Sequence, residues 1–221
     1  MKIVYLIRST LYLIKQSFSL EKKSGNKCYM LAARSLKIAW GEDDTYWKWI
    51  SLPHSRFSEV AVLGHVWWLE IRGEISPKML SPGTNYGAYL VFSLKSNAYG
   101  FDNLPIDASV GISRQEAKTR TVYLGFERSR VGPSAGVGRI PGMLRHNRSP
   151  PSEEENANTG HVRQRSDHWM EVELGDILGT GEEEEEEECI IEMSFMEVRG
   201  GNQKSGLVVQ GIEIRPKEAM P

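Results

Sequence analysis

Apolar and polar residues alternate along much of this chain, which is the pattern of strands with one face buried. In residues 68–72, Leu69 and Ile71 fall on one face of a strand and the charged side chains fall on the other. Residues 86–94 are apolar on both faces, as expected for a strand buried between layers. Similar runs, separated by Gly, Pro, Asn or Asp, occupy residues 120–124, 170–174, 190–199 and 207–215. No segment carries a sustained apolar stripe of helical period, so the sequence predicts an all-β fold, an antiparallel jelly-roll-like β-sandwich.

Two stretches interrupt this pattern. Residues 127–166 are rich in Gly, Pro, Ser and Arg and contain few core-forming side chains, which predicts a long irregular insert. Seven consecutive glutamates, residues 182–188, follow Gly179-Thr180-Gly181. Because like charges this dense repel one another and stay solvated, we expect an acidic loop over residues 179–188.

The N-terminal residues are apolar but do not form a membrane span. Their apolar runs, residues 3–7 and 11–14, are each followed by a basic residue and fall well short of the about 20 residues that a span requires. No small-x-small cleavage site of a secretory signal follows them. We therefore expect residues 1–16 to be a short arm ahead of one domain over residues 17–221, with no membrane partner.

The composition narrows the function classes further. The chain has 221 residues, with 27 Lys and Arg against 29 Asp and Glu and a formal net charge of −2. This balance argues against a protein that binds nucleic acid through bulk electrostatics. Cys28 and Cys189 provide no disulfide framework, so we expect an intracellular protein, cytoplasmic or nuclear.

The motifs of catalysis and of metal binding are incomplete. Residues 132–136 match the G-x-S-x-G string of a nucleophile elbow, but Pro133 lies inside it and the flanking strand and helix are not predicted. The five histidines are scattered, without the ligand spacing of a zinc site. We therefore expect no enzyme, no metal and no cofactor.

Large aromatic side chains gather around one predicted turn. Trp40 precedes the turn-forming residues 41–44. The chain then returns in a predicted strand that carries Tyr46, Trp47 and Trp49. Rings beside an acidic turn can form an amphipathic platform, on which the C–H face of a sugar stacks. Tryptophan is most often a core residue, so packing of these rings inside the domain is the alternative.

Several motifs along the chain occur together in one specific order. They are KCYMLAARSLKIAW, TYWKWISLP, SRFSEVAVL, WLEIRGEI, MLSPGTNYGAYLVF, RSDHWMEVELGD and KSGLVVQGIEIRPK. In these motifs the chain resembles the phloem protein two lectins, the Nictaba-type domain of plants, from about residue 17 to residue 217. The resemblance implies a jelly-roll-like sandwich that binds N-acetylglucosamine oligomers and N-glycan cores without catalysis or metal. A glycan or glycoprotein is then the expected partner.

The same resemblance implies which residues bind the sugar. Trp40 and Trp47 match the two tryptophans that carry binding in the family. Glu197 matches a family glutamate that would accept hydrogen bonds from sugar hydroxyls. Tyr46 and Trp49 are the expected supporting rings.

The chain departs from the family pattern at three informative positions. Ile190 stands where a second assisting glutamate is expected, His168 where glycine is usual, and Trp67 where the family has a smaller residue. Trp67 must therefore either fit a core position or face solvent. Because a fold can lose its site, a degenerate lectin domain that binds protein is an alternative.

Residues 17–31 are most similar to the subgroup that carries an F-box ahead of the lectin domain. Only 16 residues precede Ser17, fewer than the roughly 40–50 that the helices of an F-box need. The alternative function is therefore the substrate-recognition module of an F-box ubiquitin-ligase subunit that has lost its F-box. Binding to the ubiquitin-ligase adaptor is expected only of a longer form that carries the box.

Overall fold

The computed structural model describes residues 16–102, 104–113, 117–125, 159–180, 189–199 and 201–217. Within these residues the protein is built from strands, with two short 3-10 helices, η1 (Ala33–Ser35) and η2 (Pro77–Met79). The predicted all-β sandwich is confirmed. The strands are β1 (Gln16–Leu20), β2 (Lys27–Ala32), β3 (Lys37–Ile38), β4 (Trp47–Ile50), β5 (Val60–Leu63), β6 (Leu69–Ile75), β7 (Asn85–Tyr99), β8 (Ile106–Ile112), β9 (Lys118–Val122), β10 (Thr159–Gly160), β11 (Val162–Gln164), β12 (Met170–Leu178), β13 (Ile191–Glu197) and β14 (Ser205–Pro216).

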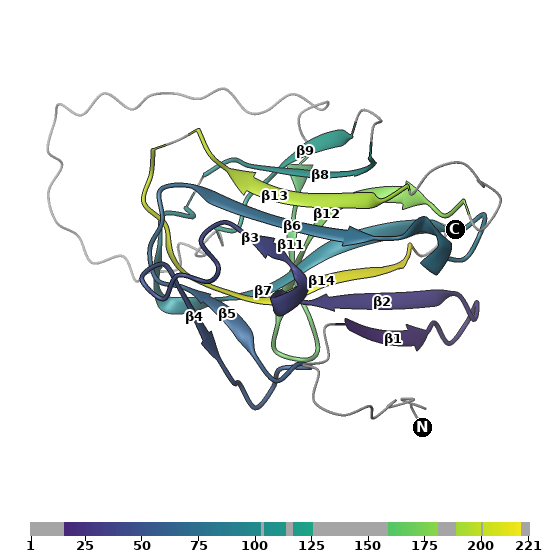
Figure 1. Ribbon diagram of the computed structural model, residues 1–221, viewed down its shortest axis with the longest axis horizontal. Coiled ribbons are helices and arrows are strands. Elements are labelled where there is room, and N and C mark those ends of the chain that lie inside the picture. Colours follow the sequence, from purple (N-terminus) through teal and green to yellow (C-terminus); the bar gives the residue numbers. More distant parts are fainter. Residues whose placement is uncertain are drawn as a thin grey trace, which may run out of the picture.

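Two sheets form the layers of the sandwich (Figure 1). An eight-stranded sheet has the order β1-β2-β14-β7-β12-β11, and the β4–β5 pair joins it through β14. A six-stranded sheet has the order β10-β9-β8-β13-β6-β3. Every pairing between the described strands is antiparallel except that of β10 with β9. The C-terminal β14 lies between β2 and β7, so the eight-stranded sheet is complete only when the end of the domain is in place.

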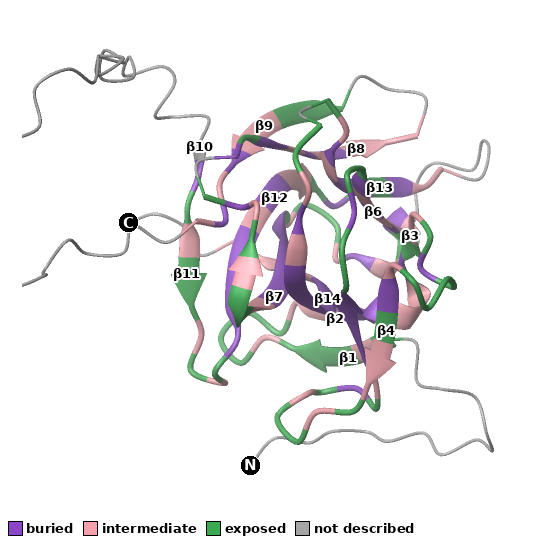
Figure 2. Cartoon of the chain, turned by 90° about the vertical axis from the view of Figure 1, so that its left-hand side faces the viewer, coloured by how far each residue is buried: buried purple, intermediate pink, exposed green. Residues whose placement is uncertain are grey.

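The main core lies between the two sheets. Along β6, buried Leu69, Ile71 and Ile75 alternate with partly exposed charged residues, as the sequence pattern predicts. Residues 86–92 of β7 are all buried, which agrees with the run that is apolar on both faces. Figure 2 shows this burial concentrated in the central strands of the sandwich.

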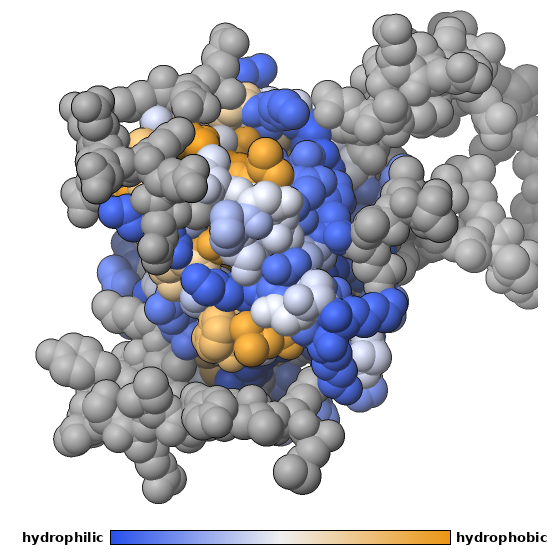
Figure 3. Space-filling view, turned by 90° about the vertical axis from the view of Figure 1, so that its right-hand side faces the viewer, coloured by the Kyte–Doolittle hydropathy of each residue, from blue (hydrophilic) through white to orange (hydrophobic). Residues whose placement is uncertain are grey.

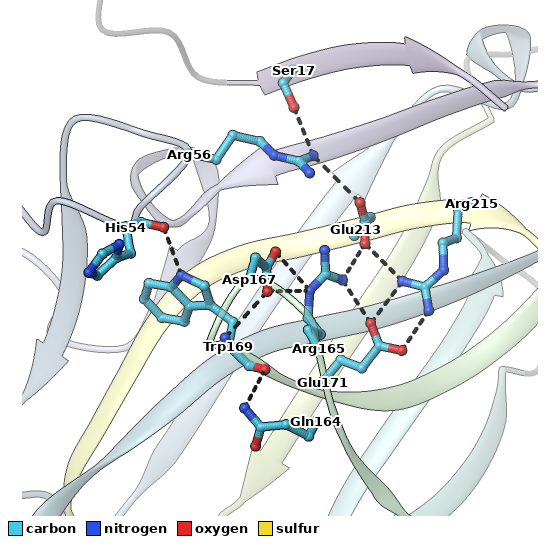
Figure 4. Close-up of polar contacts among 10 residues, drawn as sticks. All are labelled: Ser17, His54, Arg56, Gln164, Arg165, Asp167, Trp169, Glu171, Glu213 and Arg215. Atoms are coloured by element: carbon cyan, nitrogen blue, oxygen red, sulfur yellow. Dashed lines mark hydrogen bonds and ion pairs between the residues drawn. The ribbon is translucent and has the colours of Figure 1, made fainter. Parts of the chain in front are cut away.

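A second apolar cluster covers the outer face of the eight-stranded sheet. Its members come from β2, β5, β7, β14 and two connections, and they are Met30, Ala32, Phe57, Val60, Val62, Val91, Trp169 and Val208. Trp169 follows the tight turn between β11 and β12, and its indole N–H donates to the His54 carbonyl oxygen at 3.1 Å (Figure 4). The β4–β5 connection and the β11–β12 turn therefore cover this face together.

The structure corrects the predicted extent of the irregular insert, residues 127–166. Within that range, residues 159–160 form β10 and residues 162–164 form β11. β11 pairs with β12 from Val162 opposite Val172 to Gln164 opposite Met170, and sequence reasoning missed it because three residues are too few to show a period.

Three predicted features lie outside the described residues. They are the N-terminal arm up to residue 15, the G-x-S-x-G string at residues 132–136 and the glutamates 182–188. Gln16, which the sequence assigns to the arm, begins β1 and pairs with Leu31 of β2.

The two strands on either side of the aromatic turn do not pair with each other. β3 ends at Ile38 and pairs with β6 in the six-stranded sheet. β4 begins at Trp47 and pairs with β5 in the eight-stranded sheet. Residues 39–46 therefore cross from one layer to the other. This crossing lies at the left-hand end of Figure 1, the end that faces the viewer in Figure 2.

The opposite end of the sandwich has a different surface. Figure 3 shows this right-hand side, where apolar side chains gather in separate patches with hydrophilic residues between them. The visible part of that end therefore presents no single continuous apolar face.

Candidate functional site

Trp40 stands out at the crossing between the two sheets. Its backbone is left-handed, with φ of 56°, and 48% of the residue is exposed. The Ala39 N–H donates to the Glu70 carbonyl oxygen at 3.0 Å, and the Gly41 N–H donates to the Ile38 carbonyl oxygen at 2.9 Å. A bulky residue at positive φ is uncommon and costs about 1–2 kcal/mol. The fold thus exposes this indole even though its left-handed backbone is costly.

The Tyr46 ring lies beside Trp40. Their ring centroids are 5.5 Å apart and the rings are tilted by 43°. On its other side Tyr46 approaches His65, with centroids 6.0 Å apart. Tyr46 also packs against the main core, so it links the exposed rings to the interior.

Trp47 does not lie at the surface. Only 1% of it is exposed, and its indole N–H donates to the Ala39 carbonyl oxygen at 3.1 Å. The expected stacking of Trp47 on a sugar does not fit this position, because no ring face is open to a ligand. The alternative that the sequence left open, a core tryptophan, describes this residue.

Trp49 is half-buried and engaged on one face. The Arg34 guanidinium lies 3.7 Å from the centre of its ring, and its indole N–H donates to the Gly41 carbonyl oxygen at 2.8 Å. Trp47 and Trp49 thereby bind the carbonyls on either side of Trp40. Their role in this structure is to position the turn that carries Trp40. The sequence pattern could not distinguish this structural role from direct contact with a ligand.

Glu197 is buried and forms an ion pair with Lys204, which has 0% exposure. The Lys204 ammonium also donates to the Trp67 carbonyl oxygen at 2.9 Å and to the Asn202 carbonyl oxygen at 2.6 Å. The Glu197 carboxylate therefore holds a buried lysine that fastens two loops, and it is not presented to solvent as the expected sugar contact would require. Ile190 is partly buried, with its N–H donating to the Ser113 hydroxyl at 3.1 Å.

Two exposed tryptophans adjoin this end of the sandwich. Trp67 is 60% exposed and Trp68 is 44% exposed, both in the β5–β6 connection that begins next to His65. We call Trp40, Tyr46, His65, Trp67 and Trp68 the aromatic rim. The sequence indicated Trp67 only as a residue that must be core or solvent-facing, and it faces solvent.

A paired carboxylate lies at the edge of the aromatic rim. The Trp68 indole N–H donates to one Glu70 oxygen at 2.9 Å, and the Arg72 guanidinium donates to the other at 2.7 Å. These hydrogen bonds, that from Arg72 first, lower the pKa of Glu70 below its ordinary value. Glu70 is therefore a fixed anion at neutral pH.

The described residues contain no group of three or more His, Cys, Asp or Glu side chains that could hold a metal ion. None of the helices in the described ranges is long and apolar enough to cross a membrane. A cavity of about 100 Å³ lies away from the aromatic rim, with which it shares no residue, and is lined by Tyr89, Arg120, Gly160, His161, Arg163, Glu171 and Glu173.

Comparison with known proteins identifies longer relatives. The chain is 42% identical to the F-box protein PP2-B1 of Arabidopsis thaliana, over 93% of this chain and 67% of that protein. It is 40% identical to the F-box protein At2g02240 and 41% identical to the F-box protein PP2-B10 of the same plant, each over 93% of this chain. The chain spans 56% and 66% of these two relatives.

Solved structures give a weaker comparison. The Podospora anserina GH26-CBM35 beta-(1,4)-mannanase aligns with a TM-score of 0.41 and 7% identity, over 88% of this chain and 28% of that one. A similarity at this level carries no argument about this protein.

The sequence comparison with protein families covers most of the domain. The family model of phloem protein 2 matches residues 26–216, which includes every strand from β2 to β14 and all five residues of the aromatic rim. The family resemblance noted in the sequence is thereby confirmed, and the chain belongs to the phloem protein 2 family.

Proposed function

We propose that this domain binds carbohydrate without catalysis, through the exposed face of Trp40. The observation that supports the proposal is the exposure of Trp40. Its backbone is left-handed, about half of the residue is exposed, and two other tryptophans donate hydrogen bonds to the carbonyl oxygens on either side of it. A ring fixed in this way loses little conformational freedom when a ligand stacks on it, which favours binding.

The groups around Trp40 suit a neutral sugar. An aromatic face packs against the C–H face of a pyranose, while carboxylates and carbonyls accept hydrogen bonds from its hydroxyls. Acidic residues 42–44 are separated from Trp40 only by Gly41 and are exposed. The expected ligands are N-acetylglucosamine oligomers or N-glycan cores, carried by a glycoprotein in the cytoplasm or nucleus.

The test is binding of chitin oligomers to the Trp40→Ala variant, measured by calorimetry. We expect affinity to fall at least about tenfold, which corresponds to about 1.4 kcal/mol. The matched control is His168→Ala, because His168 is also exposed and also has a positive φ, of 69°, but lies in the β11–β12 turn. Unchanged affinity in Trp40→Ala, or no binding of the unaltered protein on a glycan array, contradicts the proposal.

Trp47→Ala is unsuitable for this test. Truncating a fully buried tryptophan costs about 3–5 kcal/mol of stability, so lost binding would report unfolding. We expect its denaturation midpoint to fall sharply while that of Trp40→Ala changes little.

A second candidate function comes from the relatives, which are F-box proteins. In that role the domain is the substrate-recognition module of a ubiquitin-ligase subunit, and its target is a protein or glycoprotein. The test is a pull-down of the ligase adaptor with this chain and with a longer form that carries an F-box. Capture by the longer form alone supports this role, and capture by neither contradicts it.

A further inference from the structure

Trp67 and Trp68 are adjacent and exposed in a domain that buries Trp47 and Trp169 almost completely. Scattered apolar residues on a surface are ordinary, but two exposed tryptophans at consecutive positions concentrate apolar surface in one connection, which points to a binding surface. Each indole left in water forgoes the stabilisation of burial, at about 25 cal/mol for every Å² of apolar surface. Packing inside the domain therefore does not explain these two rings, and we look for a role in binding.

The backbone that carries these rings is held firmly. The Gly64 N–H donates to the Tyr46 carbonyl oxygen at 2.7 Å. Val66 and Lys204 exchange two backbone hydrogen bonds, at 2.9 and 2.8 Å, and the Lys204 ammonium holds the Trp67 carbonyl oxygen. The connection is thus fastened to two other segments, at Tyr46 and at Lys204, and these contacts fix the backbone that carries its tryptophans.

The Trp68 ring is also fixed at its edge. Its N–H is committed to Glu70, whose other oxygen binds Arg72, so the polar edge is satisfied within the protein. What remains available is the ring face. The Glu70 carbonyl oxygen accepts the Ala39 N–H, which places the start of the Trp40 turn beside the strand that continues from Trp68.

The charges around the rings indicate the class of ligand. Glu70 is paired with Arg72 and Glu197 with Lys204, and the exposed residues 42–44 are acidic. The rim contains no lysine or arginine, and its one basic side chain, His65, packs beside the Tyr46 ring, so a phosphorylated or nucleic-acid ligand is disfavoured. A neutral oligosaccharide suits this surface, because its C–H faces can stack on the exposed rings and its hydroxyls can donate hydrogen bonds to the acidic side chains.

From this arrangement we infer that Trp67 and Trp68 form a second stacking platform, which extends the Trp40 site so that it holds a linear neutral oligosaccharide of several units. The inference rests on the proposed function, because it assigns further sugar units to the same site. It assigns a role to Trp67, which is 60% exposed.

The experiment measures affinity for N-acetylglucosamine oligomers, from the dimer to the hexamer, by calorimetry. For the unaltered protein we expect affinity to rise with chain length. For Trp67→Ala we expect ordinary affinity for the dimer but at least a fivefold loss for the hexamer. Trp67→Tyr restores part of that affinity because it keeps a ring. The matched control is Phe18→Ala on β1, an aromatic residue with comparable exposure that lies outside the rim.

The outcomes separate the two proposals. If Trp67→Ala keeps the full dependence on chain length, or if the unaltered protein shows none, the second platform is refuted while Trp40 binding stands. If the unaltered protein binds no oligomer, or if Trp40→Ala binds all of them normally, the proposed function fails and this inference fails with it.

Discussion

At the scale of single residues, backbone strain is concentrated at two positions of the described chain. Trp40 and His168 are the two described residues other than glycine with positive φ, at 56° and 69°. Histidine tolerates this region better than most residues, but glycine adopts it without steric cost. The backbone at position 168 therefore favours glycine over histidine.

The strain at His168 gives a prediction about stability. His168→Gly should be more stable than His168→Ala by about 1 kcal/mol, because alanine keeps the steric penalty of a left-handed backbone. The measurement is chemical denaturation of both variants under the same conditions. Equal stability of the two would mean that the turn relaxes out of the left-handed region when the side chain is shortened.

The sequence showed that aromatic residues gather around one turn but could not predict which of the rings are exposed. Trp40, Trp47 and Trp49 lie within one short stretch, and each is equally suited by its chemistry to stacking or to burial. What separates them is the change of sheet across residues 39–46, which leaves Trp40 outside and turns Trp47 inward. That change depends on pairing with β6 and β5, distant partners that no local pattern reveals.

At the scale of elements, the loops at the rim end are joined by Lys204. This lysine follows β13 and precedes β14, and its ammonium binds Glu197 at the end of β13 and the Trp67 carbonyl oxygen in the β5–β6 connection. A buried charge is tolerated only when it is paired and hydrogen-bonded, and this one meets that condition. The pair therefore sets the geometry of the rim.

Removal of this ammonium should be costly. Lys204→Met removes a buried countercharge from the Glu197 carboxylate, and we expect a loss of about 3–5 kcal/mol in the free energy of unfolding. The double variant Lys204→Met, Glu197→Gln should recover part of it. Lys37→Met is the control, because Lys37 pairs with Glu74 at an exposed site and should cost at most about 1 kcal/mol. A cost for Lys204→Met no larger than for Lys37→Met would show that the buried pair is dispensable.

Most strands of seven or more residues could be predicted from the sequence, as could the shorter β4 and β9, whereas β8 was missed although it spans seven residues. The pattern identified β6, β7, β12, β13 and β14, since each spans at least seven residues and shows its alternation or its apolar run. β3 and β10 have two residues each and are defined only by their partners β6 and β9. Glu197 and its lysine lie seven residues apart, too far for a strand pattern to bring them together.

At the scale of the whole molecule, a charge network joins the last strand to the middle of the chain. Figure 4 shows Glu171 of β12 binding both Arg165 and Arg215, and Glu213 binding the same two arginines. Arg56, from the β4–β5 connection, reaches Glu213 as well. Three parts of the chain that are remote in sequence are thus linked on one face of the eight-stranded sheet.

This network predicts sensitivity to acid. Burial alone would raise the pKa of Glu171, but hydrogen bonds and attraction from Arg215 and Arg165 outweigh it, and the net pKa lies below the ordinary 4.5. A carboxylate with a lowered pKa in the folded state contributes stability above its unfolded pKa, and that contribution is lost as the pH falls through the folded value. Unfolding free energy should therefore decline below about pH 4.5.

The measurement is denaturation of the unaltered protein and of Glu171→Gln across the acidic range. We expect the variant to be less stable at neutral pH and to show a flatter decline with acid, because one titrating group has been removed. Glu192→Gln, an exposed position on β13, is the control and should reproduce the slope of the unaltered protein. Parallel curves for Glu171→Gln and the unaltered protein would exclude this carboxylate as the source of acid sensitivity.

The full burial of Lys204 also has a chemical consequence. Lysine amines at the surface, such as those of Lys37 and Lys48, are open to acylating reagents, but the Lys204 amine is enclosed on every side. A reagent can reach this amine only when the rim loops open, so the rate of its labelling depends on how often they open. A sugar bound to the rim should slow that labelling, so the buried amine, which binds the Trp67 carbonyl oxygen of the rim, would report whether the rim is occupied.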